Sequence, residues 1–347
     1  MVAFRRSILT FIITFCIAML VFSVIGYALM EKYLPDEKDD GKKEKETILE
    51  TLDEALNPDS TPTEQIKKQV DAETFTLLLV GNDYQSDIKH SYADSILLVH
   101  FSCETGQVVY LPIPGNLRVK KNMKDTDLAS IYNDTNPSGT RNTDKLVDEI
   151  ETKLNIEIDH YLCTSLAANS LARVVDKVGS VSGSSGIEYK VPYDMEKSDE
   201  VKGFIDLEKG TQMLSGKEAT SMLRYIGGTS DEDYAERRDL NSRFMATLIE
   251  TIFRKFGDAE IMTMYDEFVG GGSVKSDITN INDETVLSHL DTVTQYEKFT
   301  EVFLDYPGEI KTFTDESTKK NRKYFEVDNE SLATLLDDYG FKKKVQE

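Results

Sequence analysis

Two aspartates, Asp83 and Asp94, are the clearest candidates for chemistry in this chain. Asp83 follows an apolar run that stops at Gly81, and Asp94 directly precedes a second apolar run at 95–101. If both runs are strands, both carboxylates lie in the loop that joins them, and that loop could fold them together. Mg²⁺ is usually held by one or two carboxylates together with substrate phosphate and water. The pair therefore indicates a hard-cation site; the alternative is two ordinary loop residues, because Asp is common in turns.

Arginines form the second candidate group. Arg224 lies on one predicted helix, and Arg237, Arg238 and Arg243 lie at the start of the next. Guanidinium groups make bidentate contacts with phosphate, and a helix N-terminus adds partial positive charge. These arginines could therefore bind a phosphate group. Alternatively, they are surface side chains that pair with the acidic residues at 231–236.

The composition argues against several classes of protein. The 347 residues include 62 Asp and Glu against 40 Lys and Arg, and a formal net charge of −22 is unfavourable for binding nucleic acid. The four His residues form no H-E-x-x-H motif and no G-x-S-x-G sequence is present, so the usual signatures of zinc and serine hydrolases are missing. Three Cys make no disulfide framework. Cys103 and Cys163 could pair only if the fold joins them, and small buried thiols are the simpler interpretation.

Hydrophobic periodicity gives the elements that would position these residues. Short β-rich runs predict strands, and apolar residues at three- and four-residue steps predict helices. The predicted strands are 75–81, 95–101, 107–112, 187–191, 203–207, 299–303 and 324–327. The predicted helices are 142–154, 165–178, 215–225, 239–256, 278–290 and 331–339. This order indicates an α/β fold in which a mixed central β-sheet is flanked by helices, and the glycines at 270–272 are expected to form a loop within it.

The N-terminus indicates the compartment. Residues 8–30 are uncharged and mostly apolar, and as a helix they would span roughly 34 Å, enough for a bilayer core of about 30 Å. Arg5 and Arg6 precede this run, so the positive-inside rule places the N-terminus in the cytoplasm and the rest beyond the membrane. A cleaved signal peptide is the alternative, but the run is long for one and no A-x-A site closes it. The predicted layout is a cytoplasmic tail 1–7, a transmembrane helix 8–30, an acidic extracytoplasmic linker 31–73 and a domain 74–347, with a core 74–256 and a C-terminal extension 257–347.

Several sequence blocks, in one order, carry a family resemblance. They are LLLVGNDYQSD, YADSILLVHFS, VVYLPIPGNLRV, LASIYND, LNIEIDHYLCTSL with VVDKVGSV, and GFIDLEKGTQMLSGKEATSMLRY. On these blocks the chain resembles the LytR-CpsA-Psr family of membrane-anchored cell-wall enzymes. The resemblance implies an α-β-α sandwich. It also implies a phosphotransferase that moves a glycopolymer, such as teichoic acid or capsule, from a polyprenyl pyrophosphate carrier to peptidoglycan, with the lipid tail in an apolar pocket between sheet and helices.

The resemblance also implies roles for individual residues. The aspartates that match Asp83 and Asp94 hold Mg²⁺ against the pyrophosphate, and Arg224 matches the first arginine of the family's R-x-R motif. Arg224 and Asp94 would then be catalytic. By match to the family, Arg224 and Arg238 would bind the substrate, and Arg237 and Arg118 are added as substrate-binding candidates because they lie next to the motifs. Metal and arginines together would stabilise the charge that develops on the leaving phosphate.

Other family positions differ in this chain. Tyr92, Gly115 and Ile226 stand where the family has arginine, and Asn116 stands where it has aspartate. Near Arg238, the residues Asn241 and Ser242 stand where the family has arginine and glutamine. Cations elsewhere, such as Arg118, Lys120, Lys121, Arg237 and Arg243, could compensate.

Two interpretations therefore stay open. One is a divergent but active phosphotransferase that uses Mg²⁺ on the two aspartates. The other is a non-catalytic protein of the same fold that binds or presents lipid-linked glycan. A role in transcriptional attenuation, suggested by an older name of the family, fits poorly because the folded part is acidic and is expected beyond the membrane.

Overall fold

The computed structural model describes most of the chain after residue 72. The described residues are 73–85, 90–132, 143–166, 169–199, 203–225, 231–314 and 321–344. All of them belong to one compact unit, Thr61–Glu347. None of the helices in these ranges has the length and apolar character needed to cross a bilayer. The span predicted at 8–30 lies outside the described residues and stays a prediction.

The centre of the fold is a six-stranded mixed sheet with the order β11-β6-β1-β2-β3-β12. Its strands are β1 (Phe75–Gln85), β2 (His90–Ser102), β3 (Gln107–Pro112), β6 (His160–Ser165), β11 (Val274–Ser276) and β12 (Thr300–Phe303). β1 pairs with β2 antiparallel and with β6 parallel. The central strands are buried on both faces, which is why they read as continuous apolar runs rather than alternating ones.

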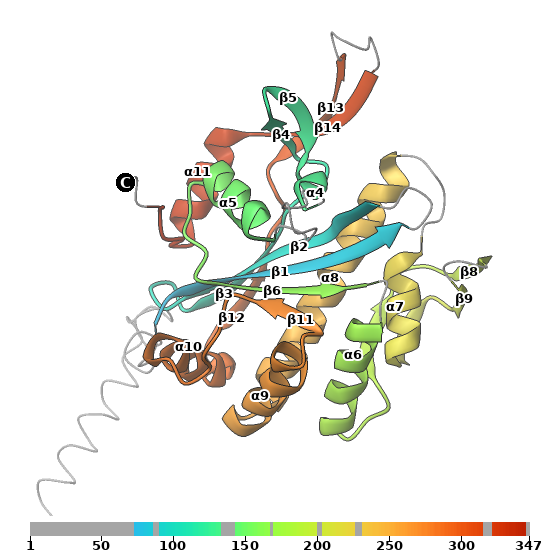
Figure 1. Cartoon of the computed structure of the whole chain (residues 1–347), viewed down its shortest axis with the longest axis vertical. Helices are drawn as coiled ribbons and strands as arrows, with labels where there is room; N and C mark the ends of the chain where they lie inside the picture. Colours follow the sequence, from blue (N-terminus) through green and yellow to red (C-terminus); the bar gives the residue numbers. More distant parts are fainter. Residues whose placement is uncertain are drawn as a thin grey trace, which may run out of the picture. The chain divides into compact units, whose positions relative to one another are not determined.

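One face of the sheet is covered by α6 (Asn169–Val181), α7 (Gly216–Arg224), α8 (Asp231–Lys255), α9 (Asp258–Met264) and the π-helical turn η1 (Tyr265–Gly270). We call it the α8 face. Its core joins the odd-numbered residues of β1, such as Leu77 and Leu79, to apolar residues of α6 and α8. Figure 1 shows α6, α7 and α9 together on this side of the sheet.

The other face, here called the α5 face, is covered by α4 (Leu128–Ile131), α5 (Thr143–Leu154) and α11 (Asn329–Asp338). Its core contains the even-numbered residues Leu78 and Val80 of β1. Two hairpins stand on this side, β4 (Arg118–Lys121) with β5 (Lys124–Asp127), and β13 (Gly308–Thr314) with β14 (Asn321–Val327). Both hairpins project beyond the sheet in Figure 1.

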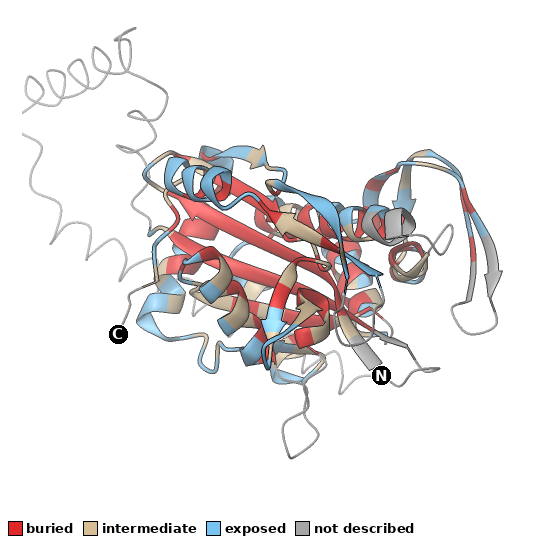
Figure 2. Cartoon of the chain, turned by 90° about the horizontal axis from the view of Figure 1, so that it is seen from above, coloured by how far each residue is buried: buried red, intermediate tan, exposed pale blue. Residues whose placement is uncertain are grey.

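The remaining elements are peripheral. They are the paired strands β7 (Ile187–Val191) and β10 (Gly210–Leu214), the paired strands β8 (Met195–Asp199) and β9 (Gly203–Leu207), the helix α10 (Glu284–Thr294) and the 3₁₀ turn η2 (Tyr296–Lys298). Figure 2 shows that buried residues follow the sheet and the inner sides of its helices, while the outer sides are exposed. The predicted mixed sheet flanked by helices is confirmed.

The structure corrects the prediction of a loop between the first two strands. Asp83 and Asp94 do not lie in a loop, because β1 continues to Gln85 and β2 begins at His90, so both aspartates are strand residues. The polar residues after Gly81 continue the antiparallel ladder, with Asp83 opposite Tyr92. The cysteines at 103 and 163 are both free: Cys163 is buried and Cys103 is half-buried.

Candidate active site

A register shift in the β1–β2 hairpin sets the direction of Asp94. Gly81 pairs with Ser95 and Asn82 pairs with Ala93, so Asp94 is the extra residue of a β-bulge. Strict alternation would place Asp94 on the α5 face with Ile96, which packs in that core. A bulge breaks this alternation and redirects a side chain. As a result Asp94 contacts Arg237 of α8, which comes from the opposite face.

Two aspartates and two arginines form a buried ion cluster at this end of the hairpin. The Arg224 Nε donates to Asp83 Oδ1 at 3.1 Å. The Arg237 guanidinium contacts Asp94 and lies 3.7 Å from Asp83 Oδ2. The side chains of Asp83 and Arg237 are each only 1% exposed, whereas Arg224 is 16% exposed. The sequence alternative of surface arginines paired with the acids at 231–236 is therefore wrong for Arg237.

Local sequence features place both arginines. Ser215 and Glu218 form a capping box that starts α7, and Arg224 is the last helical residue, where a cation also interacts favourably with the helix dipole. On α8, Arg237 shares a face with Asn241 and Phe244, because these positions are four and three residues apart. Phe244 is fully buried in the core of the α8 face, so the same face carries Arg237 into the interior.

An apolar cavity of about 210 Å³ lies on the α8 face. It is lined by Leu77 and Leu79 of β1, Leu171 and Val174 of α6, Leu248 of α8 and Phe268 of η1, among others. Asp83 shares the strand face of Leu79, about 13 Å further along β1 at the usual rise per residue. Apolar cavities of this order stay dry and accept apolar ligands.

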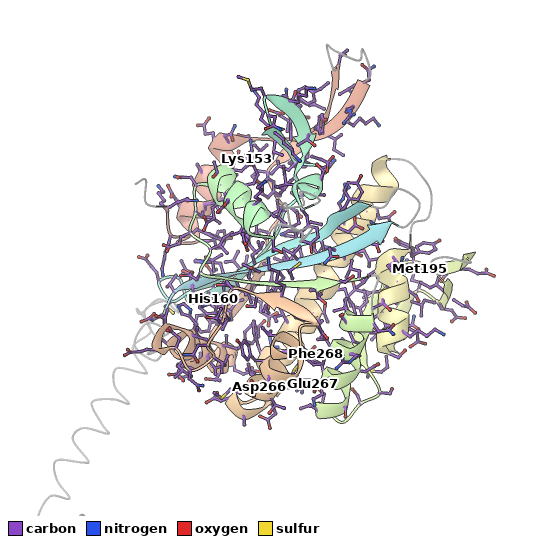
Figure 3. The ribbon with its side chains drawn as sticks, in the orientation of Figure 1. Lys153, His160, Met195, Asp266, Glu267 and Phe268 are labelled. Carbon is purple, nitrogen blue, oxygen red and sulfur yellow. The ribbon has the colours of Figure 1, made fainter. Side chains whose placement is uncertain are left out.

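Exposed ion pairs tie two walls of this cavity together. Glu267 of η1 accepts from Lys177 of α6 at 2.9 Å and pairs with Arg173 of α6 at 3.5 Å. The Arg173 guanidinium also lies 5.5 Å from the centre of the Phe268 ring. Figure 3 shows Glu267 and Phe268 in the space between α9 and α6.

A polar groove of about 760 Å³ lies beside Asp94, walled mainly by elements of the α5 face and on one side by Arg238 of α8. We call it the β14 groove. Its lining includes Tyr92, Asn116, Asp127, Arg238, Arg322 and Lys323. Burial, Asp127 and Asp94 together raise the pKa of Tyr92, and burial raises the pKa of Asp127. The ion cluster is thus flanked by an apolar cavity on one face and by a polar groove on the other.

Comparison with known proteins identifies the family. The model of the LytR_cpsA_psr family matches residues 38–339. The chain belongs to the LytR_cpsA_psr family. No curated protein matches it. Among solved structures, it is similar to B. subtilis TagV, with 22% identity, a TM-score of 0.57, and coverage of 78% of this chain and 98% of that one.

Two further structures share the fold of this LytR_cpsA_psr member. One is a LytR-Csp2A-Psr enzyme from Actinomyces oris, with 23% identity, a TM-score of 0.53, and coverage of 78% of this chain and 93% of that one. The other is TagT bound to LIIa-WTA, with 19% identity, a TM-score of 0.53, and coverage of 82% of this chain and 92% of that one. At these identities the similarity establishes the fold.

The structure shows what surrounds the departures from the family pattern. A Cβ atom on Gly115 would lie 2.9 Å from Arg238 Nε, so the Arg238 side chain occupies the space beside this glycine. Tyr92 and Asn116 line the β14 groove together with Arg238. Ile226 lies outside the described residues.

The predicted substrate-binding arginines do not all meet. Arg224 and Arg237 join the aspartates, and Arg238 lines the adjoining groove. Arg118 instead pairs with Asp125 at 2.7 Å and with Glu326 at 3.3 Å, and covers the Phe313 ring. These contacts tie the two hairpins together and do not reach the ion cluster.

Asn241 is a polar residue with an unusual environment. Its side chain is fully buried, and neither amide atom has a hydrogen-bond partner among the described residues. Buried polar groups in native proteins are nearly always hydrogen-bonded, and each exception calls for an explanation such as a catalytic role or a bound ion. Because Asn241 follows Arg237 by one helical turn, it extends the polar surface of the ion cluster along α8.

The donor set at the cluster fits Mg²⁺. Asp83 and Asp94 provide only oxygen, and their carboxylates converge closely enough for one guanidinium to reach both. Mg²⁺ commonly uses one or two carboxylates and completes its shell with water and phosphate oxygens. Within the described residues no group of three or more His, Cys, Asp or Glu side chains is arranged as a metal site, so the remaining ligands would have to come from substrate and water.

Three residues of the β14 groove were not found from the sequence. Asp127 directly precedes the LASIYND block and belongs to no motif. Arg322 and Lys323 belong to the run KKNRK, a basic cluster in an acidic chain that could have been noticed. Nothing in the sequence, however, indicated that β14 would approach Asp94.

Proposed function

We propose that this protein is a membrane-anchored extracytoplasmic phosphotransferase that moves a glycopolymer from a polyprenyl pyrophosphate carrier to peptidoglycan. Family membership supports the reaction class. The similar structure of TagT holds LIIa-WTA, which supports a lipid-linked wall teichoic acid or a related glycan as donor. The uncharged run at 8–30 supports the anchor.

The observation that carries this proposal is the alignment of cavity and ion cluster along β1. The apolar cavity is lined by Leu77 and Leu79, and Asp83 follows on the same strand face. A polyprenyl chain requires an apolar cavity, and its pyrophosphate requires cations at the end of that cavity. Arg224, the more exposed of the two arginines, is placed to contact the pyrophosphate.

The charges of the cluster suit a pyrophosphate only if a further cation joins. Among the described residues, the contacts of the cluster join two guanidinium groups to two carboxylates, and these four charges sum to zero. Asp83 and Asp94 would hold Mg²⁺, which when bound would neutralise charge on the phosphate oxygens. Arg237, which contacts both aspartates, would hold the two carboxylates together, and the more exposed Arg224 would stabilise the charge of the leaving phosphate.

The second candidate function is a non-catalytic protein that binds or presents lipid-linked glycan. It is favoured by Gly115 and Asn116, which replace charged residues of the family pattern. Arg238 beside Gly115 argues for compensation, because it puts a guanidinium next to the glycine. We therefore place catalysis first.

The test uses the full chain in detergent micelles with a polyprenyl pyrophosphate-linked saccharide as donor, uncrosslinked peptidoglycan glycan strands as acceptor, and Mg²⁺. We expect release of polyprenyl monophosphate, and we expect its rate to fall about 10²-fold or more in Asp94→Asn and Arg224→Ala. Arg243→Ala is the matched control, because Arg243 is exposed and pairs with Asp239 away from the cluster. Tight donor binding without any release would favour the non-catalytic candidate, and absence of binding would contradict both.

A further inference from the structure

We infer that the β14 groove is the binding site for the second substrate, a carbohydrate that carries anionic groups, and that Asp127 receives the proton of its attacking hydroxyl. This inference rests on the proposed phosphotransfer. It assigns a place and a set of residues to the acceptor.

The first argument is geometric. In phosphoryl transfer the attacking and the leaving oxygen lie roughly in line on opposite sides of phosphorus. The apolar cavity places the lipid, and hence the leaving group, on the α8 face. The acceptor hydroxyl must then arrive from the other side of the cluster. Asp94 both contacts Arg237 and lines the β14 groove, so the groove opens on the required side.

The second argument is the chemistry of the groove. Arg322 and Lys323 are exposed on β14, and Arg238 lines the wall formed by α8. Three cations in one groove are unexpected in a chain with a net charge of −22. Asn116 and Tyr92 add hydrogen-bonding groups of the kind that carbohydrate hydroxyls use. The lining thus suits a saccharide with carboxylates.

The third argument is that this wall is held in place. The Phe325 N–H of β14 donates to the Asn116 carbonyl at 2.9 Å, and the Tyr324 hydroxyl donates to the Asp125 carbonyl at 3.3 Å. Arg118 bridges Asp125 and Glu326 across the two hairpins. Arg118 therefore acts as a positioning residue, and Figure 1 shows the two hairpins side by side above the sheet.

Among the described residues that line the groove, Asp127 is the carboxylate that is not in the ion cluster. One of its oxygens accepts from the Ser130 N–H at 2.9 Å and caps α4. In the proposed step the acceptor O–H bond breaks and its proton passes to Asp127. A bond forms between that oxygen and phosphorus while the bond from phosphorus to the lipid phosphate oxygen breaks, and polyprenyl monophosphate leaves.

The experiment measures binding of fluorescently labelled, uncrosslinked peptidoglycan glycan strands to the full chain by anisotropy. We expect Arg322→Ala to weaken strand binding about tenfold or more, in line with the loss of one charge-assisted contact. Lys311→Ala is the matched control, because Lys311 lies on the same hairpin outside the groove. Strands whose carboxylates are amidated should bind weakly to the unaltered chain. Their affinity for Arg322→Ala should be the same, because the group that Arg322 contacts is gone.

Asp127→Asn tests the proton transfer, since Asn caps a helix as well as Asp does. We expect strand binding to be retained and transfer to fall about 10²-fold or more. Equal strand binding by Arg322→Ala and Lys311→Ala would overturn the groove as the acceptor site. A loss of donor binding in Arg322→Ala would also overturn it, because the groove would then hold the donor glycan. Strand binding with no transfer in the unaltered chain would instead contradict the phosphotransfer and the role of Asp127, and would leave the binding site standing.

Discussion

Arg237 is a charged side chain in a nearly closed environment. It is 1% exposed, and its partners Asp83 and Asp94 are almost as inaccessible. Removing one partner of such a group leaves uncompensated buried charge, which typically costs about 3–5 kcal/mol. We expect Arg237→Met to lower the free energy of unfolding by that amount, measured by urea denaturation.

The control for this prediction is Arg243→Met on the same helix. Arg243 pairs with Asp239 at an exposed position, where ion pairs contribute at most about 1 kcal/mol. If Arg237→Met unfolded at the same urea concentration as Arg243→Met, Arg237 would not be stabilised by its buried contacts with the two aspartates, and the description of the cluster as a buried ion pair network would be contradicted.

A substitution of Asn241 should affect the stability of the fold and the binding of substrate in different ways. Its buried amide has no partner among the described residues, so a leucine of similar volume would remove a group that costs roughly 1–3 kcal/mol when unsatisfied. We expect Asn241→Leu to unfold at equal or higher urea concentration but to bind polyprenyl pyrophosphate more weakly. Ser242→Ala, one residue on, is the comparison for both measurements. Weaker folding in Asn241→Leu would show that the amide has a structural role.

Individual residues were predictable to different degrees. Asp83, Asp94 and Arg224 carry types and spacings that sequence reasoning singled out, and the fold brings them together. Arg118 was grouped with them only because it follows a motif, and its pairing with Asp125 depends on a hairpin register that the sequence did not indicate. Charge type is readable from sequence, whereas the partner of a charge is a tertiary property.

At the scale of elements, long periodic segments were predictable and short polar ones were not. The predicted runs of β1, β2 and β3 and the helices α5 to α8 correspond to observed elements. The hairpin ends of β1 and β2 were predicted as a loop because their residues are polar, yet backbone pairing continues there. The β4–β5 hairpin was missed for the same reason. Local propensity describes a strand well only where the strand is also buried.

Gly115 and Arg238 give a prediction about two elements in contact. A methyl group at Gly115 would lie 2.9 Å from Arg238 Nε, so Gly115→Ala must displace the guanidinium. We expect a loss of about 1–3 kcal/mol in the free energy of unfolding, as for other overpacked sites, and weaker binding of polyprenyl pyrophosphate. Gly270→Ala is the matched control, since its added methyl would have only one atom nearby, at 4.0 Å.

A double-mutant cycle decides whether Arg238 is the cause. In an Arg238→Ala background, Gly115→Ala should cost clearly less than in the unaltered chain, because the opposing side chain is gone. Equal costs in both backgrounds would assign the effect to the backbone at Gly115 instead.

At the scale of the molecule, the sheet separates an apolar cavity from a polar groove. The α8 face holds the apolar cavity, the α5 face carries the hairpins and the polar groove, and the bulge at Asp94 joins them. This division depends on the mixed sheet being covered on both faces. In a chain with many acidic residues, the proposed phosphate site depends on a few arginines, of which Arg224 and Arg237 meet at the end of the β1–β2 hairpin.

His100 links the stability of the whole domain to pH. It is fully buried on β2, its Nδ1 lies 3.0 Å from the Thr76 hydroxyl, and its ring stacks on that of Phe341 with the ring centres 4.0 Å apart. Burial is the main cause that lowers the pKa of His100 from 6.5 to about 4, and Lys342 lowers it further. Between pH 6.5 and about 4, the folded protein therefore keeps this imidazole neutral, whereas the unfolded chain protonates it.

A lowered pKa fixes the sign of the effect. Above pH 6.5 the imidazole is neutral in both states and costs nothing, whereas between pH 6.5 and about 4 only the unfolded chain gains the proton, so stability falls as the pH falls. The shift corresponds to about 3 kcal/mol between pH 7 and pH 4. Urea denaturation measures the free energy of unfolding of the unaltered chain and of His100→Gln across this pH range. Between pH 7 and pH 4 the unaltered chain should lose about 3 kcal/mol more than His100→Gln, because all other groups titrate in both proteins. Parallel curves would mean that His100 has the same pKa in the folded domain as in the unfolded chain.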